Sequence, residues 1–96
     1  MAEYRLSPAA ANDLDGIFRY TLQQWGLEQA IRYTQAMEKV CSELAETPTR
    51  APECSHIRPG YRRGVADRHF VYFQVEDYGI AVIRILHQQM DAPRHI

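Results

Sequence analysis

The chain has 96 residues, of which 46% are hydrophobic and 24% charged, and its formal net charge is -1 at pH 7. This length allows one domain, residues 1–96, and the composition excludes extended disorder. The near-zero net charge is not that of a typical nucleic-acid binder, and we expect no direct sequence-specific contact with nucleic acid. No apolar run is long enough for a signal peptide or a membrane span, so we expect a cytoplasmic protein without membrane contact.

The basic residues are almost all arginine, because Lys39 is the only lysine. A guanidinium offers forked, stacking-capable contacts, which favours binding to macromolecules. The two cysteines, Cys41 and Cys54, form no metal-binding pattern, and we expect two reduced thiols with no metal and no cofactor.

Two helices with almost no linker are predicted near the N-terminus. Ser7 followed by Pro8 is typical of an N-cap and a first helical position, which predicts a helix over residues 8–25. Gly26 is typical of a C-terminal cap, and a second helix is predicted over residues 27–46.

Each predicted helix carries one apolar stripe at spacings of three and four, which predicts a hairpin with a common inner face. Asp13 lies near the start of the first helix, where it favours the helix dipole. Trp25 is expected to pack in the core or within the hairpin. The first stripe comprises Leu14, Ile17, Phe18, Thr21 and Trp25, and the second comprises Ala30, Tyr33, Met37, Val40, Cys41 and Leu44.

Three strands are predicted after a crossing loop at 47–59, which is rich in proline, threonine and serine. They cover residues 61–66, 69–75 and 80–87, with a turn at 77–79. The sequence therefore predicts an antiparallel meander.

A short extended segment at residues 3–6 is expected to join this meander, which gives an α+β fold: an N-terminal strand, a helical hairpin, then a three-stranded antiparallel meander. Strand alternation divides the sheet into two faces. The second face is only half polar, which suggests cover by a partner. The predicted helix-facing residues are Val71, Phe73, Val75, Ala81, Ile83 and Ile85, and those on the second face are Tyr72, Gln74, Val82, Arg84 and Leu86.

The order of several short motifs resembles the ParE branch of the RelE/ParE toxin superfamily. The match runs from Tyr4 to His95, and its joint spacing is more specific than any single piece. The residues that carry it are Leu6-Ser7-Pro8, Ala10, Asp13-Leu14, Ile17, Tyr20, Trp25-Gly26, Gln29-Ala30, Tyr33, Ile57, Gly60-Tyr61-Arg62, Arg84-Ile85-Leu86-His87, Met90-Asp91 and Arg94-His95.

The resemblance implies the fold described above and a cognate ParD-like antitoxin that wraps and neutralises the toxin in a hetero-oligomer. It also implies one of two activities. Members of the ParE branch poison DNA gyrase by trapping it on cleaved DNA, whereas members of the RelE branch cleave messenger RNA in the ribosome.

A ribonuclease needs a proton acceptor, a cation for the phosphorane charge and an acid for the leaving oxygen. Arg62, Arg84 and His87 are the residues that could supply them. Arg84 and His87 are three apart on one strand, so they start on opposite faces unless a bulge intervenes. The chain also departs from the RelE branch, because it has a single lysine and no tyrosine after Tyr78.

A poison needs no catalytic residue, only an interface that binds one state of its target better than another. We therefore expect no catalytic residues, and a target-contacting surface on the strands and the C-terminal segment. Its predicted members are Arg62, Arg68, Tyr72, Arg84, His87, Met90, Asp91, Arg94 and His95.

The antitoxin is expected either to lay an amphipathic helix beside the helical hairpin or to add a strand to a sheet edge. The predicted antitoxin contacts are Tyr20, Leu22, Ile31 and Tyr33. A third alternative, a non-toxic relic that retains only the antitoxin interface, is also compatible with the sequence.

Overall fold

The computed structural model of the chain describes residues 2–96 and contains every predicted helix and strand, with ends that agree within one residue. A short 3-10 helix in the crossing loop and a four-residue helix near the C-terminus are additional. The elements are β1 (Glu3–Leu6), α1 (Pro8–Trp25), α2 (Leu27–Glu46), η1 (Pro48–Arg50), β2 (Tyr61–Ala66), β3 (His69–Glu76), β4 (Gly79–His87) and α3 (Ala92–His95).

Local capping sets the ends of α1. The Ser7 side chain accepts a hydrogen bond from the N–H of Ala10 at 3.0 Å, and Pro8 occupies the first helical position. Gly26 adopts a φ of 93°, which L-residues rarely adopt, and its N–H donates to the oxygen of Leu22. The chain then enters α2 at once, so the two helices form the predicted hairpin.

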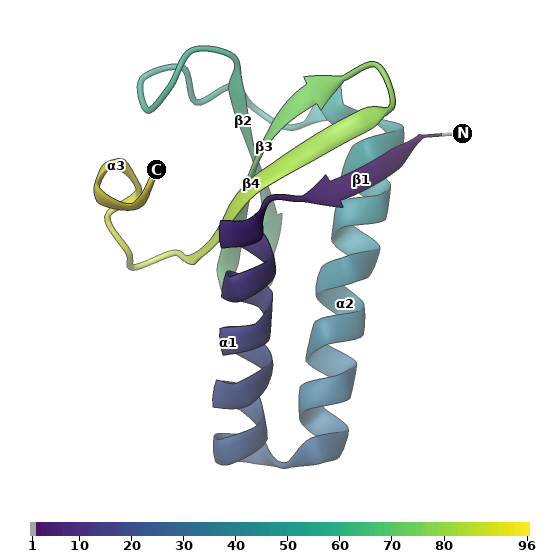
Figure 1. Ribbon diagram of the computed structural model, residues 1–96, viewed down its shortest axis with the longest axis vertical. Coiled ribbons are helices and arrows are strands. Elements are labelled where there is room, and N and C mark those ends of the chain that lie inside the picture. The colour runs from purple at the N-terminus through teal and green to yellow at the C-terminus, as the bar shows by residue number, and fades with distance from the viewer. Residues whose placement is uncertain (1) are drawn as a thin grey trace.

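The sheet has the order β1-β4-β3-β2, with β1 parallel to β4 and the other pairs antiparallel. The helical hairpin packs on one face of this sheet and extends well beyond it (Figure 1). The prediction of an α+β fold with a strand, a helical hairpin and a meander is confirmed. The buried core between the layers is formed by Ala10, Met37, Cys41, Ala45, Ala51, Ala66, Val71, Phe73, Ile80, Val82 and Ile85.

A β-bulge in β4 changes which residues face the helices. Tyr72 pairs with Arg84 but Phe73 pairs with Val82, so Ile83 has no partner across the ladder. The helix-facing residues before the bulge are Ile80 and Val82, which corrects the prediction of Ala81 and Ile83; after the bulge, Ile85 faces the helices as predicted. Val71 and Phe73 also lie on the predicted face, whereas Val75 is exposed.

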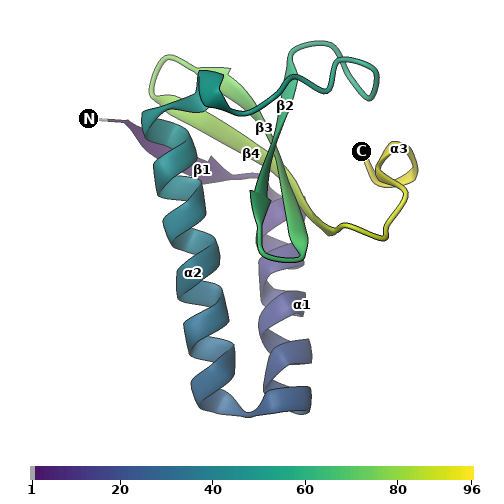
Figure 2. The ribbon, with the colours of Figure 1, turned by 180° about the vertical axis from the view of Figure 1, so that it is seen from behind.

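Part of the second face of the sheet is covered by the chain itself. The part of the crossing loop that leads into β2 lies with α3 on the side of the sheet away from α2 in both ribbon views (Figures 1 and 2). They enclose a second apolar cluster, which corrects the expectation that this face is left open for a partner. Its buried members are Cys54, Tyr72, Leu86 and Ala92, with Ile57, Tyr61, Phe70 and Ile96 packed around them.

Among residues 2–96, no helix combines the length and the apolar character that crossing a membrane requires.

Candidate functional site

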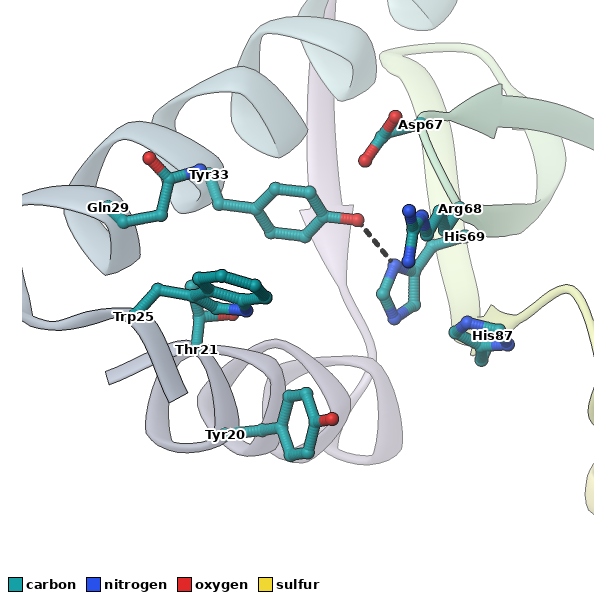
Figure 3. Close-up of a pocket in the computed structure, with 9 residues that line it drawn as sticks. All are labelled: Tyr20, Thr21, Trp25, Gln29, Tyr33, Asp67, Arg68, His69 and His87. Carbon is teal, nitrogen blue, oxygen red and sulfur yellow. Dashed lines mark hydrogen bonds between the residues drawn. The ribbon is translucent and has the colours of Figure 1, made fainter. Parts of the chain in front are cut away.

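The part of the helical hairpin that the sheet does not cover lines a hollow of about 390 Å³ (Figure 3). The turn between β2 and β3 closes the opposite side of this hollow. The lining residues are Tyr20, Thr21 and Trp25 of α1, Gln29 and Tyr33 of α2, and Asp67, Arg68, His69 and His87 of the sheet.

A chain of three side chains crosses the floor of the hollow. The Tyr33 hydroxyl lies 2.8 Å from Nδ1 of His69, and the ring of His87 stands edge-on to His69 with the centroids 5.3 Å apart. Burial lowers the pKa of His69, and the neighbouring His87 lowers it further. The pKa of Tyr33 is raised, mainly by burial and then by Asp67. Both shifts favour the neutral forms, and the tautomer of the His69 ring sets which of the two groups donates the hydrogen bond.

Aromatic side chains stand at the open side of the hollow. Trp25 is 73% exposed and Tyr20 is 64% exposed. The prediction that Trp25 packs in the core or the hairpin is wrong, because Trp25 lies in the last turn of α1, beyond the reach of the sheet. Arg68 also lines the hollow. Exposed large aromatic side chains beside an arginine are typical of protein-binding surfaces.

The hollow continues along α2 as a groove. A narrow second hollow shares Tyr33 and Asp67 with the first, and a shallow third one shares Val40 with the second. The three hollows follow one another along α2, are lined mainly by one side of α2 and the edge of β2, and are together called the α2 groove here. The two further hollows add Ala36, Met37, Ala66, Glu43, Leu44, Glu46, Thr47, Arg50 and Val65.

The predicted antitoxin contacts divide between this groove and the rest of the surface. Tyr20 and Tyr33 line it. Leu22 and Ile31 are exposed but do not line it. Ile31 lies two residues before Tyr33 and therefore about 200° around the helix, on the far side of α2.

Arg84, a predicted target contact, is partly buried and bonded to other parts of the chain. Its Nε and Nη2 donate to the carboxylate of Asp13 at 2.7 and 2.9 Å, and its Nη1 donates to the oxygen of His95. The ion pair explains the raised pKa of Arg84. Asp13 thus forms hydrogen bonds to the sheet. From the sequence, we predicted only a favourable interaction with the dipole of α1. No local signal in the sequence reveals a partner 71 residues away.

Tyr72 cannot contact a target directly, because it is only 2% exposed beneath α3 and the crossing loop. This corrects its assignment to the target-contacting surface. Arg62 is also largely covered, since its guanidinium donates to the oxygen of Ala51 at 2.7 Å and pairs with Glu53 at 3.3 Å.

The remaining predicted target contacts are accessible. Arg68 and His95 are exposed, and Met90 is 41% exposed. Asp91 and Arg94 form the expected i, i+3 pair at 3.7 Å. His87 is half-buried, and its Nδ1 accepts a hydrogen bond from the N–H of Gln89.

The three residues that a ribonuclease would require do not come together. Arg84 is level with Tyr72, whereas His87 is level with His69, and strand alternation places Arg84 and His87 on opposite faces. Arg62 pairs with Phe73, which lies four residues along β3 from His69, the partner of His87. Arg62 on β2 is also two strands away from His87 on β4. These steps separate Arg62 from His87 by about 13 Å along the sheet and about 10 Å across it.

Across residues 2–96, no three histidine, cysteine, aspartate or glutamate side chains cluster closely enough to hold a metal ion. Both thiols are buried, and burial is the main reason that the pKa of Cys41 is raised to about 12. The side chains that line the first hollow are aromatic, cationic or able to form hydrogen bonds. Such groups suit recognition of another macromolecule.

Comparison with known proteins agrees with this geometry. A family model described as the ParE toxin of the type II toxin-antitoxin system, parDE, matches residues 4–92. The Toxin ParE1 of Caulobacter vibrioides is 38% identical over 96 residues, covering 100% of this chain and 99% of the relative. A Toxin ParE1 of Mycobacterium tuberculosis is also 38% identical over 96 residues, covering 99% and 98%. The Toxin ParE of Escherichia coli is 34% identical over 92 residues, covering 95% and 89%.

A solved structure described as the chromosomal ParDE TA system from P. aeruginosa superposes with a TM-score of 0.77 at 22% identity, covering 91% of this chain and 96% of that one. That likeness shows the fold. Fold and sequence together place the chain in the class of type II toxin-antitoxin toxins. Within this class, it belongs to the ParE toxin family.

Proposed function

We propose that this toxin poisons DNA gyrase and is held inactive by a cognate ParD-like antitoxin. Membership of the ParE family supports a toxin that acts on gyrase, as the ParE branch does. The choice of gyrase over RNA rests on one observation: Arg62, Arg84 and His87 are dispersed over two faces of the sheet and over two strands, β2 and β4, that are not neighbours. No group that could take a 2′-hydroxyl proton lies beside a free cation in that set.

Poisoning by binding fits the side chains that remain available. The exposed candidates are Arg68 at the turn between β2 and β3, and Met90, Arg94 and His95 in the C-terminal segment. A surface of this kind shifts a target between two states only by the difference in its affinity for them. We infer that it binds the state of gyrase that holds cleaved DNA more tightly than the resealed state.

The test is a cleavage assay with purified gyrase, supercoiled plasmid, ATP and the toxin. Protein-linked double-strand breaks should accumulate with toxin concentration and disappear when a stoichiometric amount of the antitoxin is added. Unchanged supercoiling and an absence of breaks at saturating toxin would rule out gyrase as the target.

The ribonuclease alternative makes a different prediction in the same preparation. Translating ribosomes programmed with a defined messenger RNA should yield cuts at fixed codon positions if the chain cleaves RNA. We expect intact transcripts. A chain inactive in both assays that still binds the antitoxin would instead be the non-toxic relic.

A further inference from the structure

The first hollow, between the helical hairpin and the sheet, has the size and the lining of a small-molecule site. Its volume of about 390 Å³ lies within the ~300–1,000 Å³ that such sites usually occupy. Two of the titratable side chains that line it, Tyr33 and His69, have shifted pKa values, as groups in binding sites often do. The hollow is therefore a candidate site for a ligand much smaller than a protein.

The two walls of this hollow differ in chemistry (Figure 3). The helix α1 contributes the largely exposed rings of Trp25 and Tyr20. The sheet and the turn between β2 and β3 contribute Arg68, His69 and His87. A ligand in the hollow consequently meets aromatic rings on one side and nitrogen groups on the other.

The hydrogen bond to His87 shows what its ring offers to a ligand. Nδ1 of His87 accepts from the N–H of Gln89 at 3.1 Å, so in the neutral ring the proton is on Nε2. Nε2 is then a hydrogen-bond donor, whereas a metal ion needs a nitrogen without a proton. The ring of His87 therefore suits an anion and not a metal ion.

Arg68 provides a cation on the same wall. It is exposed, and no carboxylate of residues 2–96 lies within ion-pair distance of its guanidinium. Asp67 is the single acidic residue that lines the hollow, and its charge acts on Tyr33, whose pKa it helps to raise. The forked donors of Arg68 are thus available to an anion, and a phosphate group accepts such a fork in two parallel hydrogen bonds.

A ligand that uses both walls carries an anionic group and a flat aromatic ring joined by a short spacer. A simple anion would leave the rings of Trp25 and Tyr20 unused, and an uncharged aromatic molecule would leave Arg68 without a partner. A nucleotide has both parts, because its phosphate suits the arginine and its base stacks on an aromatic side chain. Stacking and phosphate contacts read no base sequence, in keeping with the expectation of no sequence-specific contact with nucleic acid.

We propose that the first hollow binds one nucleoside 5′-phosphate unit, with the phosphate on Arg68 and His87 and the base against Trp25. A free nucleotide and a single strand of nucleic acid both present this unit. The inference goes beyond the proposed function and does not rest on it. Since Arg68 is also a candidate contact with gyrase, the test measures nucleotide binding itself in the absence of gyrase.

The experiment titrates the full-length toxin with adenosine 5′-monophosphate and follows the fluorescence of Trp25, the only tryptophan in the chain. Excitation at the red edge of the tryptophan absorption band avoids absorption by the base. Stacking should quench the fluorescence in a saturable way. Adenosine and inorganic phosphate each offer half of the ligand, and both should bind about tenfold or more weakly. Adenosine that binds as tightly as the monophosphate would overturn the phosphate contact.

Two charge-removing variants locate the phosphate. Arg68→Gln removes the cation of the hollow, and Arg32→Gln removes one from an exposed part of α2 that does not line it. Both change the net charge equally, so long-range electrostatic effects cancel in the comparison. Calorimetric titration should give a Kd for the monophosphate about tenfold or more weaker in Arg68→Gln than in Arg32→Gln. Agreement of the two Kd values would overturn the site.

Trp25→Leu tests the stacking contact by calorimetry, because the fluorophore is lost. Trp25 is 73% exposed, so the variant should keep its fold, which circular dichroism checks. We expect the affinity for the monophosphate to fall by about fivefold or more. An unchanged affinity would contradict a base placed against Trp25.

A short single-stranded oligodeoxyadenylate without terminal phosphates separates the two sources of the ligand. Tighter binding of the oligonucleotide than of the monophosphate would assign the site to a nucleic-acid strand, and the reverse order would assign it to a free nucleotide. No saturable binding of either would overturn the inference. A failure here leaves the proposed function intact, because neither gyrase nor the antitoxin takes part in these measurements.

Discussion

The carboxylate of Asp13 in α1 accepts three hydrogen bonds from β4: two from the guanidinium of Arg84, at 2.7 and 2.9 Å, and one from the N–H of Ile85 at 2.9 Å. The same guanidinium reaches the oxygen of His95 in the C-terminal segment. One ion pair therefore joins the first helix, the last strand and the C-terminal segment.

Replacing Arg84 with alanine should destabilise the fold by about 2 kcal/mol. This is less than the ~3–5 kcal/mol expected for breaking a fully buried pair, because the two side chains keep 21% and 14% exposure. Arg84→Lys should recover only part of the loss, since an ammonium cannot make the forked contact. Urea unfolding followed by circular dichroism measures both. Equal stability of Arg84→Ala and the wild type would contradict a structural role.

The role of Arg84 in toxicity can be separated from its role in stability by comparison with Asp13→Ala. Both variants break the pair, but only Arg84→Ala removes the guanidinium. From the enclosed position of Arg84 we expect both to lose toxicity to a similar degree at growth temperature. Toxicity lost only in Arg84→Ala would instead indicate direct contact with the target.

The C-terminal segment should protect one particular thiol. Ala92 of α3 packs in the same cluster as Cys54, which is 2% exposed and whose pKa is raised mainly by burial. Ala92→Asp places a charge in that cluster, and we expect α3 to detach. A disulfide reagent at pH 8 should then modify one thiol quickly, while Cys41 of α2 stays protected in the core between the helices and the sheet. Rapid modification of both thiols would mean that the substitution unfolds the whole domain.

Stability should fall on acidification because of His69. Burial, followed by the charge of His87, lowers its folded pKa below the usual value near 6.5, so the unfolded state binds the proton more readily. The contribution of His69 to the free energy of unfolding is complete above pH 6.5. It is lost as the pH falls from 6.5 toward the pKa of His69 in the folded state. His69→Gln should show a smaller change between pH 7 and pH 5. The groups that face His69 are Tyr33, Asp67, His87 and, at longer range, Asp13.

Two glycines should differ in their tolerance of alanine. At Gly64 the new Cβ would lie 2.6 Å from the end of the Leu44 side chain, which can move, so we expect a cost of about 1–3 kcal/mol. At Gly79, where φ is 139°, the Cβ would overlap the backbone oxygen of Glu3 in the neighbouring strand. Gly79→Ala should therefore cost more. A larger urea-midpoint change for Gly64→Ala would reverse this expectation.

The predictable features are those set by neighbouring residues. Ser7, Pro8 and Gly26 fix the ends of α1 through local caps, and sequence reasoning placed both helices correctly. The faces of β4 could not be assigned, because the bulge at Ile83 depends on pairing with β3.

Exposure at the candidate site was harder to foresee for the same reason. Trp25 lies on a regular apolar stripe, and nothing local reveals that the sheet stops short of it. The burial of Tyr72 depends on a C-terminal segment that folds back across the sheet from 20 residues further along the chain. Both errors concern which distant segment covers a given surface, a property that hydrophobic periodicity does not encode.

The parallel pairing of β1 with β4 joins the first strand in the chain to the last strand. Their paired residues run from Glu3↔Gly79 to Leu6↔Val82. The ladder cannot close during synthesis until residue 82 has emerged, so a nascent chain stalled before that point lacks a completed sheet. Premature termination should consequently yield inert fragments instead of a partly active poison. A cell that makes this toxin is therefore exposed to the folded form only after β4 has been translated.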